Sequence, residues 1–271
     1  MNHMKLPDSL HSFVQVDRDG TLPIVLGHGF GTDKTTWDAL LRCLPSHFRY
    51  VRYDLAGAGS DEDTAIRYRA SHHSTLFGYA DDLIALLEVL QLRSVTYIGH
   101  SVSCMIGAIA AVARPDLFAR LIFIGASPHY LKAPGYPGEI LPRDLESLYA
   151  AMATNYQAWA AGFAPQIFGI ADSALLAEYS KTLFRLQPSI ALRTLQMIFQ
   201  TDFRELVGKI HQPVHLIHSR HDFAVPEGVA LWLHKHIAGS TLDWIDDPGH
   251  LPHVTSAPDV CLLIHRYLPI E

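Results

Sequence analysis

Residues 95–105 read Val95-Thr96-Tyr97-Ile98-Gly99-His100-Ser101-Val102-Ser103-Cys104-Met105. A β-rich apolar run ends at Gly99, and a helix-compatible apolar run begins just after Ser103. Ser101 therefore stands in a sharp strand-to-helix turn, with a small residue two positions away on either side. This pattern is typical of a nucleophile elbow, in which the turn raises a hydroxyl above the sheet edge and the helix N-terminus faces it. The usual pattern has glycine at the second flanking position, where this chain has Ser103.

On either side of this stretch, short apolar runs alternate with helix-compatible runs. The expected strands are 12–16, 23–26, 50–53, 95–98, 121–124, 214–218 and 241–245, and the expected helices are 37–44, 83–90, 105–113, 227–237 and 259–267. Strands that alternate with helices predict an α/β fold with a mostly parallel, doubly wound sheet. Residues 60–75 are charged and aperiodic, which predicts a surface loop.

The alternation stops between residues 131 and 202, where no strand-like run occurs. Four helix-compatible pieces take its place, at 143–153, 155–163, 172–186 and 189–201. A helical insert between two strands of a sheet is typical of a lid. We therefore expect a core formed by residues 1–130 and 203–271, with residues 131–202 inserted as a four-helix lid.

Composition narrows the class of function. The formal net charge is −6 without a lysine or arginine block, which disfavours nucleic-acid binding. The longest apolar run has about nine residues, against about 20 needed to cross a bilayer. The N-terminal residues are polar and resemble no secretory signal, and the three cysteines have no paired spacing. We expect a cytoplasmic protein that does not associate with membranes.

A base and an acid for the serine follow later in the chain. Ser101, Asp222 and His250 occur in the order serine, acid, histidine, which is the order of an α/β-hydrolase triad. Asp222 follows the strand expected at 214–218, and His250 lies after the strand expected at 241–245. Because parallel strands place their carboxyl ends at one edge, we expect all three side chains there.

Each assignment has a competitor. An aspartate such as Asp222 is also common in turns and helix caps, and Asp246 and Asp247 lie closer to the histidine in sequence. His250 is one of seventeen histidines, and His253 is the alternative base. We favour Asp222 because it follows a clear strand and lies one strand before the histidine. We favour His250 because the pair Gly249-His250 comes after a late strand, close to the C-terminus.

An oxyanion hole should come from two backbone N–H groups. The residue after the nucleophile, Val102, supplies one, and Phe30 in His28-Gly29-Phe30-Gly31 supplies the other. This glycine loop lacks the third glycine of a dinucleotide site and the Gly-Lys-Ser/Thr of a phosphate loop. The pair His72-His73 has no third ligand at zinc spacing. We expect neither a cofactor nor a metal.

The expected lid is rich in aromatic residues. Most of them should pack inside the lid or against the core, and a few should line an apolar pocket above Ser101. With Phe30, Tyr130 and Phe223 at its mouth, the pocket predicts a small, mostly apolar and uncharged substrate. The aromatic residues of the lid are Tyr149, Tyr156, Trp159, Phe163, Phe168, Phe184 and Phe199.

Several segments resemble the RsbQ-like α/β-hydrolases, a family that contains a bacterial stress-response regulator and the plant receptors for strigolactones and karrikins. Ser103 in place of glycine is typical of this group. The matching segments are Leu26 to Asp33, Gly99 to Gly107, Ser127 to Leu131, Gly249 to His253 and, in the lid, Asn155-Tyr156, Trp159, Gly162 to Pro165 and Thr182 to Phe184.

The resemblance implies slow hydrolysis of a butenolide or related ester through Ser101, Asp222 and His250. It also implies that a partner protein reads out ligand binding at the lid, which would make the chain a ligand receptor, in the cytoplasm or also the nucleus, with incidental hydrolysis. Dehalogenase or epoxide hydrolase chemistry would need aspartate at position 101, while haloperoxidase or lyase variants stay open. The implied pocket residues are Phe30, His100, Tyr130, Trp159, Phe163, Ile198, Phe199 and Phe223.

Overall fold

A seven-stranded sheet forms the centre of the molecule, with strand order β1-β3-β2-β4-β5-β6-β7. Only β1 is antiparallel to its neighbour, and the other pairs are parallel, which confirms the mostly parallel sheet. The structure, a computed structural model, describes residues 6–7, 10–58, 67–169 and 173–269. The strands are β1 (Val14–Asp17), β2 (Pro23–Gly27), β3 (Arg49–Tyr53), β4 (Val95–His100), β5 (Phe118–Ile124), β6 (Val214–Ser219) and β7 (Thr241–Ile245).

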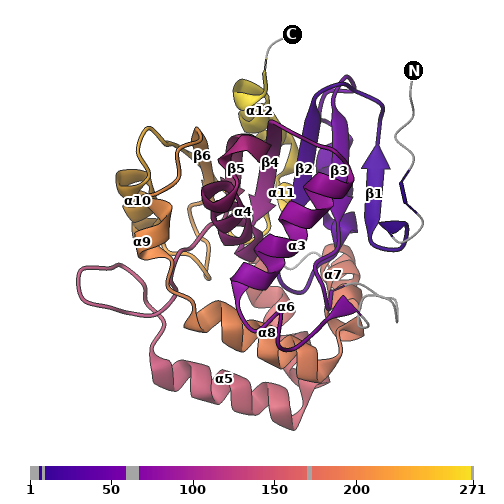
Figure 1. Ribbon diagram of the computed structural model, residues 1–271. Coiled ribbons are helices and arrows are strands. Elements are labelled where there is room, and N and C mark those ends of the chain that lie inside the picture. Colours follow the sequence, from indigo (N-terminus) through magenta and orange to yellow (C-terminus); the bar gives the residue numbers. More distant parts are fainter. Residues whose placement is uncertain (1–5, 8–9, 59–66, 170–172, 270–271) are drawn as a thin grey trace.

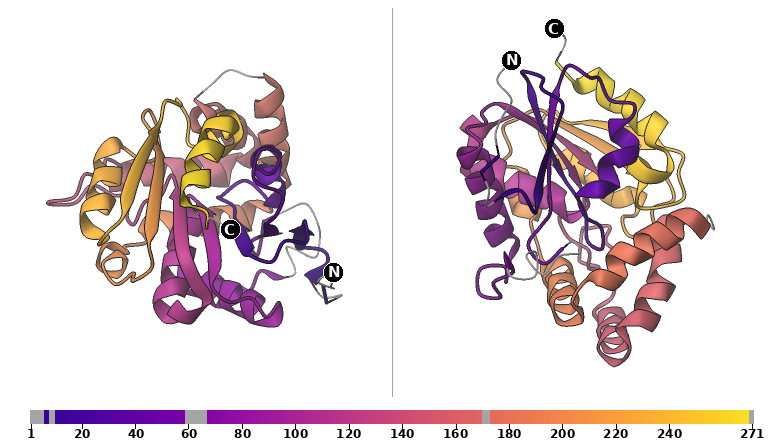
Figure 2. Two further views of the ribbon diagram at one scale, coloured as in Figure 1. Left: turned by 90° about the horizontal axis from the view of Figure 1, so that it is seen from above. Right: turned by 90° about the vertical axis from the view of Figure 1, so that its right-hand side faces the viewer.

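Helices cover both faces of this sheet (Figures 1 and 2). On one face, α3 (Leu76–Val89), α4 (Val102–Ala113), α9 (Arg204–Val207) and α10 (Glu227–His236) contribute to the larger apolar core. On the other face, α1 (Asp38–Leu41) and α12 (Ala257–Tyr267) pack over a second core, next to α11 (Pro252–Thr255). The central strand β4 is buried along its whole length, as expected for a strand covered on both sides.

Four helices lie between β5 and β6, where the sequence predicted a helical insert. They are α5 (Pro142–Thr154), α6 (Tyr156–Phe168), α7 (Ser173–Arg185) and α8 (Pro188–Gln200). In Figure 1 they form a layer at the end of the sheet that is opposite both chain termini. They have a small apolar core of their own that includes Tyr156, Phe168 and Leu183.

Several boundaries differ from the sequence predictions. The helix expected at 37–44 is a 3₁₀ turn, η2 (Lys34–Trp37), followed by the four-residue α1, because Asp33 accepts the Thr35 N–H and starts the helix early. The short elements η3 (Pro115–Leu117), α9 and α11 were not expected. Part of the surface loop predicted at 60–75 lies outside the described residues. No helix in the described ranges is both long and apolar enough to cross a bilayer.

Candidate active site

The elbow is tighter than the sequence indicated. Strand β4 ends at His100 and helix α4 begins at Val102, so Ser101 alone makes the turn, with φ 54° and ψ −122°. A Cβ atom at Gly99 would lie 2.9 Å from backbone atoms of Ser103 and Cys104, so the first flanking position has no room for a side chain. The turn leaves the Ser101 hydroxyl at the carboxyl end of the central strand.

The three predicted triad residues are joined by hydrogen bonds. His250 Nδ1 lies 2.6 Å from Asp222 Oδ2, and His250 Nε2 lies 2.8 Å from Ser101 Oγ. A carboxylate only accepts, so the tautomer that fits has the proton on Nδ1 and leaves Nε2 to accept the serine O–H. Asp222 Oδ1 is occupied by the N–H groups of Ala224 and Val225, which hold its carboxylate in place.

The competing acid and base have other partners. Asp247 accepts from the Gly249 N–H and from the hydroxyls of Thr255 and Ser256, so it organises the loop that carries His250. His253 Nε2 lies 3.1 Å from Thr36 Oγ1, and burial lowers the pKa of His253 to about 3. Asp246 is exposed to solvent. Neither of these aspartates contacts the Ser101–His250 pair.

A helix of the insert contacts the loop that carries the candidate base. The His250 N–H donates to the carbonyl of Ile167 in α6, at 2.8 Å. A Cβ atom at Gly249 would lie 2.1 Å from the Phe168 carbonyl oxygen, so glycine is required for this close approach. The position of His250 therefore depends on the insert as well as on the core.

His100 connects the elbow to the same loop. Its Nε2 donates to the His250 carbonyl at 2.8 Å, while its buried Nδ1 has no partner among the described residues. Burial lowers the pKa of His100 well below its ordinary value, and the neighbouring His253 and His250 lower it further. His100 thus remains a neutral donor that connects the end of β4, just before Ser101, to the backbone of His250.

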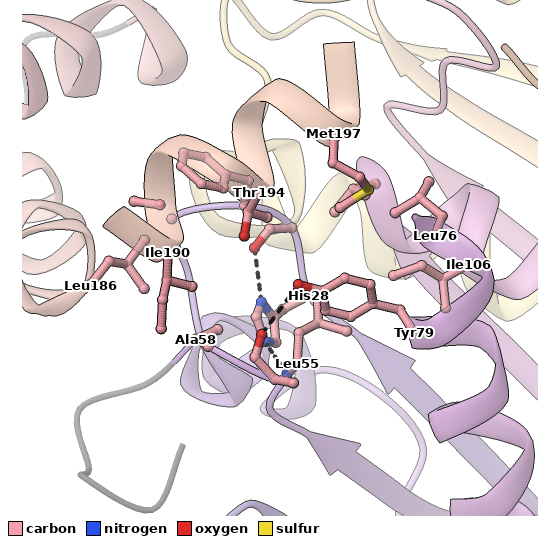
Figure 3. Close-up of a pocket in the computed structure, with 17 residues that line it drawn as sticks. His28, Leu55, Ala58, Leu76, Tyr79, Ile106, Leu186, Ile190, Thr194 and Met197 are labelled. Carbon is pink, nitrogen blue, oxygen red and sulfur yellow. Dashed lines mark hydrogen bonds between the residues drawn. The ribbon is translucent and has the colours of Figure 1, made fainter. Parts of the chain in front are cut away.

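The glycine loop after β2 lies beside the elbow, as predicted. Ser103 Oγ donates to the His28 carbonyl at 2.5 Å, so the hydroxyl that replaces the usual glycine joins the elbow helix to this loop. In the described part of the chain, no acceptor takes the Phe30 N–H. Phe30, His28 and Val102 also line a small apolar cavity of about 30 Å³, beside helix α8 (Figure 3).

A larger cavity of about 650 Å³ lies above Ser101 and His250. All eight residues of the predicted pocket line it: Phe30, His100, Tyr130, Trp159, Phe163, Ile198, Phe199 and Phe223. Of the aromatic residues predicted for the lid, Tyr156 and Phe168 pack inside the helical insert instead, and Phe184 is partly exposed. Asp222 and Val102 are absent from the described lining of this cavity. Asp222 lies behind the His250 imidazole, and Val102 faces the small cavity.

The sequence interpretation missed part of this lining. Leu145, Leu148 and Leu195 add apolar surface from α5 and α8, and their spacing on amphipathic helices was the available signal. Glu139 and Asp144 add two carboxylates, for which the sequence held no signal because both lie where the chain enters α5.

His72, His73 and Asp82 are the described residues that come closest to a metal site, with three ligand atoms within 4.8 Å of one another. The sequence interpretation saw no third group here because Asp82 lies on α3, outside the histidine loop. The Arg69 N–H donates to His73 Nδ1, so the His73 proton is on Nε2 and points at Asp82 Oδ2. A metal at Nε2 would require an imidazolate, and the three groups fit a hydrogen-bonded clamp between loop and helix better.

The clamp also affects the carboxylate. Burial by itself would raise the pKa of Asp82, but the hydrogen bonds from His73 and His72 outweigh it and lower this pKa. The carboxylate therefore stays charged and holds the loop against α3.

Known proteins with similar sequences include α/β-hydrolases that match nearly the whole chain. A sequence profile described as the alpha/beta hydrolase fold matches residues 23–257. The chain is 44% identical to the Karrikin insensitive 2 receptor CA of Petunia hybrida over 261 residues, covering 96% of this chain and 95% of the relative. It is 37% identical to the Strigolactone esterase D14 of Arabidopsis thaliana over 257 residues, 94% of this chain and 96% of that one.

Solved structures show the same fold. A hydrolase from Oleispira antarctica superposes with a TM-score of 0.90 at 30% identity, and the match covers 94% of this chain and 93% of the other. Together with the sheet order and the helical insert, these likenesses decide the classification. The chain belongs to the α/β-hydrolase family and is related over nearly its full length to plant proteins named Karrikin insensitive 2 receptor and Strigolactone esterase.

Proposed function

We propose that this protein is a serine hydrolase that cleaves a small, uncharged, mostly apolar ester or lactone through an acyl-enzyme on Ser101. The observation that carries the proposal is the continuous hydrogen-bond chain from Ser101 through His250 to Asp222, at the base of a cavity lined mainly by apolar side chains. A serine hydroxyl becomes nucleophilic when a base takes its proton and a third group holds that base in one tautomer.

In the proposed mechanism, Ser101 Oγ attacks the substrate carbonyl while His250 Nε2 takes the hydroxyl proton. Asp222 holds the imidazole and stabilises the positive charge that forms on it. The N–H groups of Phe30 and Val102 donate to the oxyanion. His250 then gives the proton to the leaving oxygen, the carbon–oxygen bond breaks, and a water activated by His250 releases the acid and restores Ser101.

The cavity supports a substrate class. A volume of about 650 Å³ and a predominantly apolar lining suit an uncharged ligand. Glu139 and Asp144 at its edge disfavour anionic substrates by charge repulsion. Relatives named Strigolactone esterase and Karrikin insensitive 2 receptor support a butenolide lactone as the natural ligand.

The relatives named as receptors favour a second candidate function. In it, residues 131–202 act as a lid over the core of residues 1–130 and 203–271, and a protein partner binds the lid once the ligand is in place. Hydrolysis is then slow or incidental. Three free cysteines support a cytoplasmic location, where thiols stay reduced, and a plant-type receptor would also enter the nucleus.

Turnover of p-nitrophenyl acetate by wild type and Ser101→Ala tests the proposal. We expect the variant to lose roughly 10³-fold or more in kcat, because removing the nucleophile removes the covalent route. Ser74→Ala, which alters an exposed loop serine, is the matched control. Wild-type turnover by Ser101→Ala would refute the assignment.

A butenolide separates the two functions. Mass spectrometry of the wild-type protein should show an adduct on Ser101 or His250 if turnover is the main role. A receptor should instead show a ligand-induced rise in Tm, and capture a partner, equally well in Ser101→Ala. A Tm shift that persists in Ser101→Ala without any adduct on wild type would favour the receptor.

A further inference from the structure

The backbone of the glycine loop is held in place by side chains around it. The carbonyl of His28 accepts from Ser103 Oγ, and the carbonyl of Gly29 accepts from Thr32 Oγ1 at 2.9 Å. The carbonyl of Gly31 accepts from Thr182 Oγ1 at 2.6 Å. Ser103 and Thr32 belong to the core, whereas Thr182 belongs to α7 of the helical insert. One of these bonds therefore crosses from the insert to the loop.

The Gly29 carbonyl decides where the Phe30 N–H points. In a planar trans peptide unit, the C=O of one residue and the N–H of the next point in opposite directions. Besides Thr32 Oγ1, the His28 ring holds this carbonyl from Nδ1 at 2.8 Å. The Leu55 N–H donates to His28 Nε2, so the His28 proton is on Nδ1 and is available to Gly29 (Figure 3). With this carbonyl held on one side, the Phe30 N–H is left on the other.

The Gly31–Thr32 peptide unit, two units further along the loop, extends the same relation to the insert. The Gly31 carbonyl points at Thr182, so the Thr32 N–H points the opposite way, and it lies 3.4 Å from the Gly29 carbonyl oxygen. The Thr182 hydroxyl is therefore connected to the Phe30 N–H through two trans peptide units, Gly31–Thr32 and Gly29–Phe30. The contact between the Thr32 N–H and the Gly29 carbonyl joins these two units. The Thr182 hydroxyl also lies 2.8 Å from the Tyr179 carbonyl in its own helix, so one proton is shared between helix and loop.

Close packing makes this contact specific. Gly31 has φ +80°, and a Cβ atom there would lie 2.7 Å from the Tyr179 hydroxyl and 3.0 Å from Leu183. Glycine suits position 31 because it adopts this φ without strain and leaves room for these two side chains of α7. Thr182 itself lies outside the described lining of the large cavity, so its hydroxyl is placed to act on the loop and not on the ligand.

We propose that Thr182 is a positioning residue through which the helical insert orients the Phe30 amide of the oxyanion hole, and that Thr32 transmits this orientation. The inference rests on the proposed function, since it assigns a role within that oxyanion hole. If α7 moves away from the core, the Gly31 carbonyl loses its donor and the Phe30 N–H loses its fixed direction. The insert thereby controls turnover as well as access to the cavity.

Thr182→Val tests this with little change in side-chain volume. We expect kcat to fall about three- to tenfold, the size of one lost hydrogen bond and less than the roughly 10²–10³-fold for losing an oxyanion donor outright. Affinity for a trifluoromethyl ketone, which forms a tetrahedral adduct with a nucleophilic serine, should fall by the same factor. KM should stay within about twofold, because an amide that acts on the transition state contributes little to substrate binding.

Three further variants make the result specific. Thr182→Ser keeps the hydroxyl and should restore both quantities. Thr154→Val makes the same chemical change on α5, where the hydroxyl bonds within its own helix, and should have no effect. Thr32→Val should reproduce the Thr182→Val pattern, and it replaces that variant if Thr182→Val does not fold.

The outcomes separate two failures. If Thr182→Val matches Thr182→Ser in kcat and in ketone affinity, the positioning role is wrong although the hydrolase assignment stands. A rise in KM alone would also overturn it. If Ser101→Ala keeps wild-type turnover, the proposed function fails first, and the Phe30 amide resonance then tests the positioning directly by NMR. It should shift in Thr182→Val and not in Thr182→Ser, and an unchanged resonance in both would refute the inference.

Discussion

At the scale of single residues, the backbone of Ser101 is the feature on which the site depends. A positive φ is unfavourable for a residue with a side chain, and such conformations persist only where their surroundings hold them. Here the Ser101 N–H donates to the Ile124 carbonyl at 2.9 Å, and its own carbonyl accepts from the Cys104 N–H at 2.9 Å. The neighbouring strand β5 and the following helix α4 thus hold the turn from both sides.

Gly99→Ala should disrupt this turn. The added methyl group would meet backbone atoms of Ser103 and Cys104 that cannot move away independently. We expect a loss of stability of about 1–3 kcal/mol, comparable to an overpacked core, and at least a tenfold fall in kcat. Chemical denaturation and ester turnover measure the two effects.

Gly208→Ala is the matched control for this substitution. Gly208 has helical backbone angles, and a Cβ atom there would have only an ordinary contact at 3.8 Å. The free energy of unfolding of Gly208→Ala should stay within about 1 kcal/mol of wild type. Equal behaviour of the two alanine variants would show that the elbow tolerates a side chain at position 99.

At the scale of elements, helix α6 links the cavity to His250, the proposed base. It supplies Trp159 and Phe163 to the cavity lining, and its Ile167 carbonyl accepts the His250 N–H. Asn155 is the N-cap of this helix, and its side chain accepts the Ala158 N–H at 3.0 Å. The insert therefore contributes directly to the geometry of the site.

Asn155→Ala should loosen the start of α6. Loss of a side-chain N-cap lowers helix stability by about 1 kcal/mol. In this protein the affected helix carries Trp159 and Phe163, two aromatic side chains of the cavity lining. We expect faster amide hydrogen exchange in α6 and weaker binding of an apolar ligand. Asn155→Asp keeps a capping oxygen and should behave like wild type, whereas a loss in both variants would show that capping is not the cause.

At the scale of the whole molecule, several buried histidines make stability depend on pH. Burial lowers the pKa of His218 to about 4 and that of His253 to about 3. The unfolded chain takes up protons below pH 6.5, while these folded groups stay neutral. Their contribution to stability is present above pH 6.5 and is lost as the pH falls towards 4 and 3. Each should cost about 2 kcal/mol between pH 7 and pH 5.

Urea denaturation at pH 7 and pH 5 measures this loss. Neither ring nitrogen of His218 has a partner among the described residues, so His218→Leu leaves no broken hydrogen bond in that part of the chain. This variant should lose less stability between the two pH values than wild type. His211→Gln, at an exposed position, should keep the wild-type dependence. An identical dependence in His218→Leu would contradict the assignment.

The sequence by itself determined the order of strands and helices, the helical insert and the serine at the turn. These features depend on the periodicity of apolar residues and on local turn chemistry, which act between near neighbours in the chain. The same reasoning narrowed the base to His250 and the acid to Asp222, but it left His253 and Asp247 as competitors. Helix boundaries such as the 3₁₀ turn at Lys34–Trp37 were wrong because a cap at Asp33 overrode the apolar pattern.

Only the tertiary structure decided which distant groups meet. His250 lies 149 residues from Ser101, and it contacts Ser101 and the α6 carbonyl because the insert packs over the sheet edge. Packing of the insert also places carboxylates at the edge of the cavity and Thr182 on the Gly31 carbonyl, while the fold of the loop before α3 places His72 and His73 against Asp82. Such contacts are set by how whole elements dock, and no local pattern in the chain records that docking.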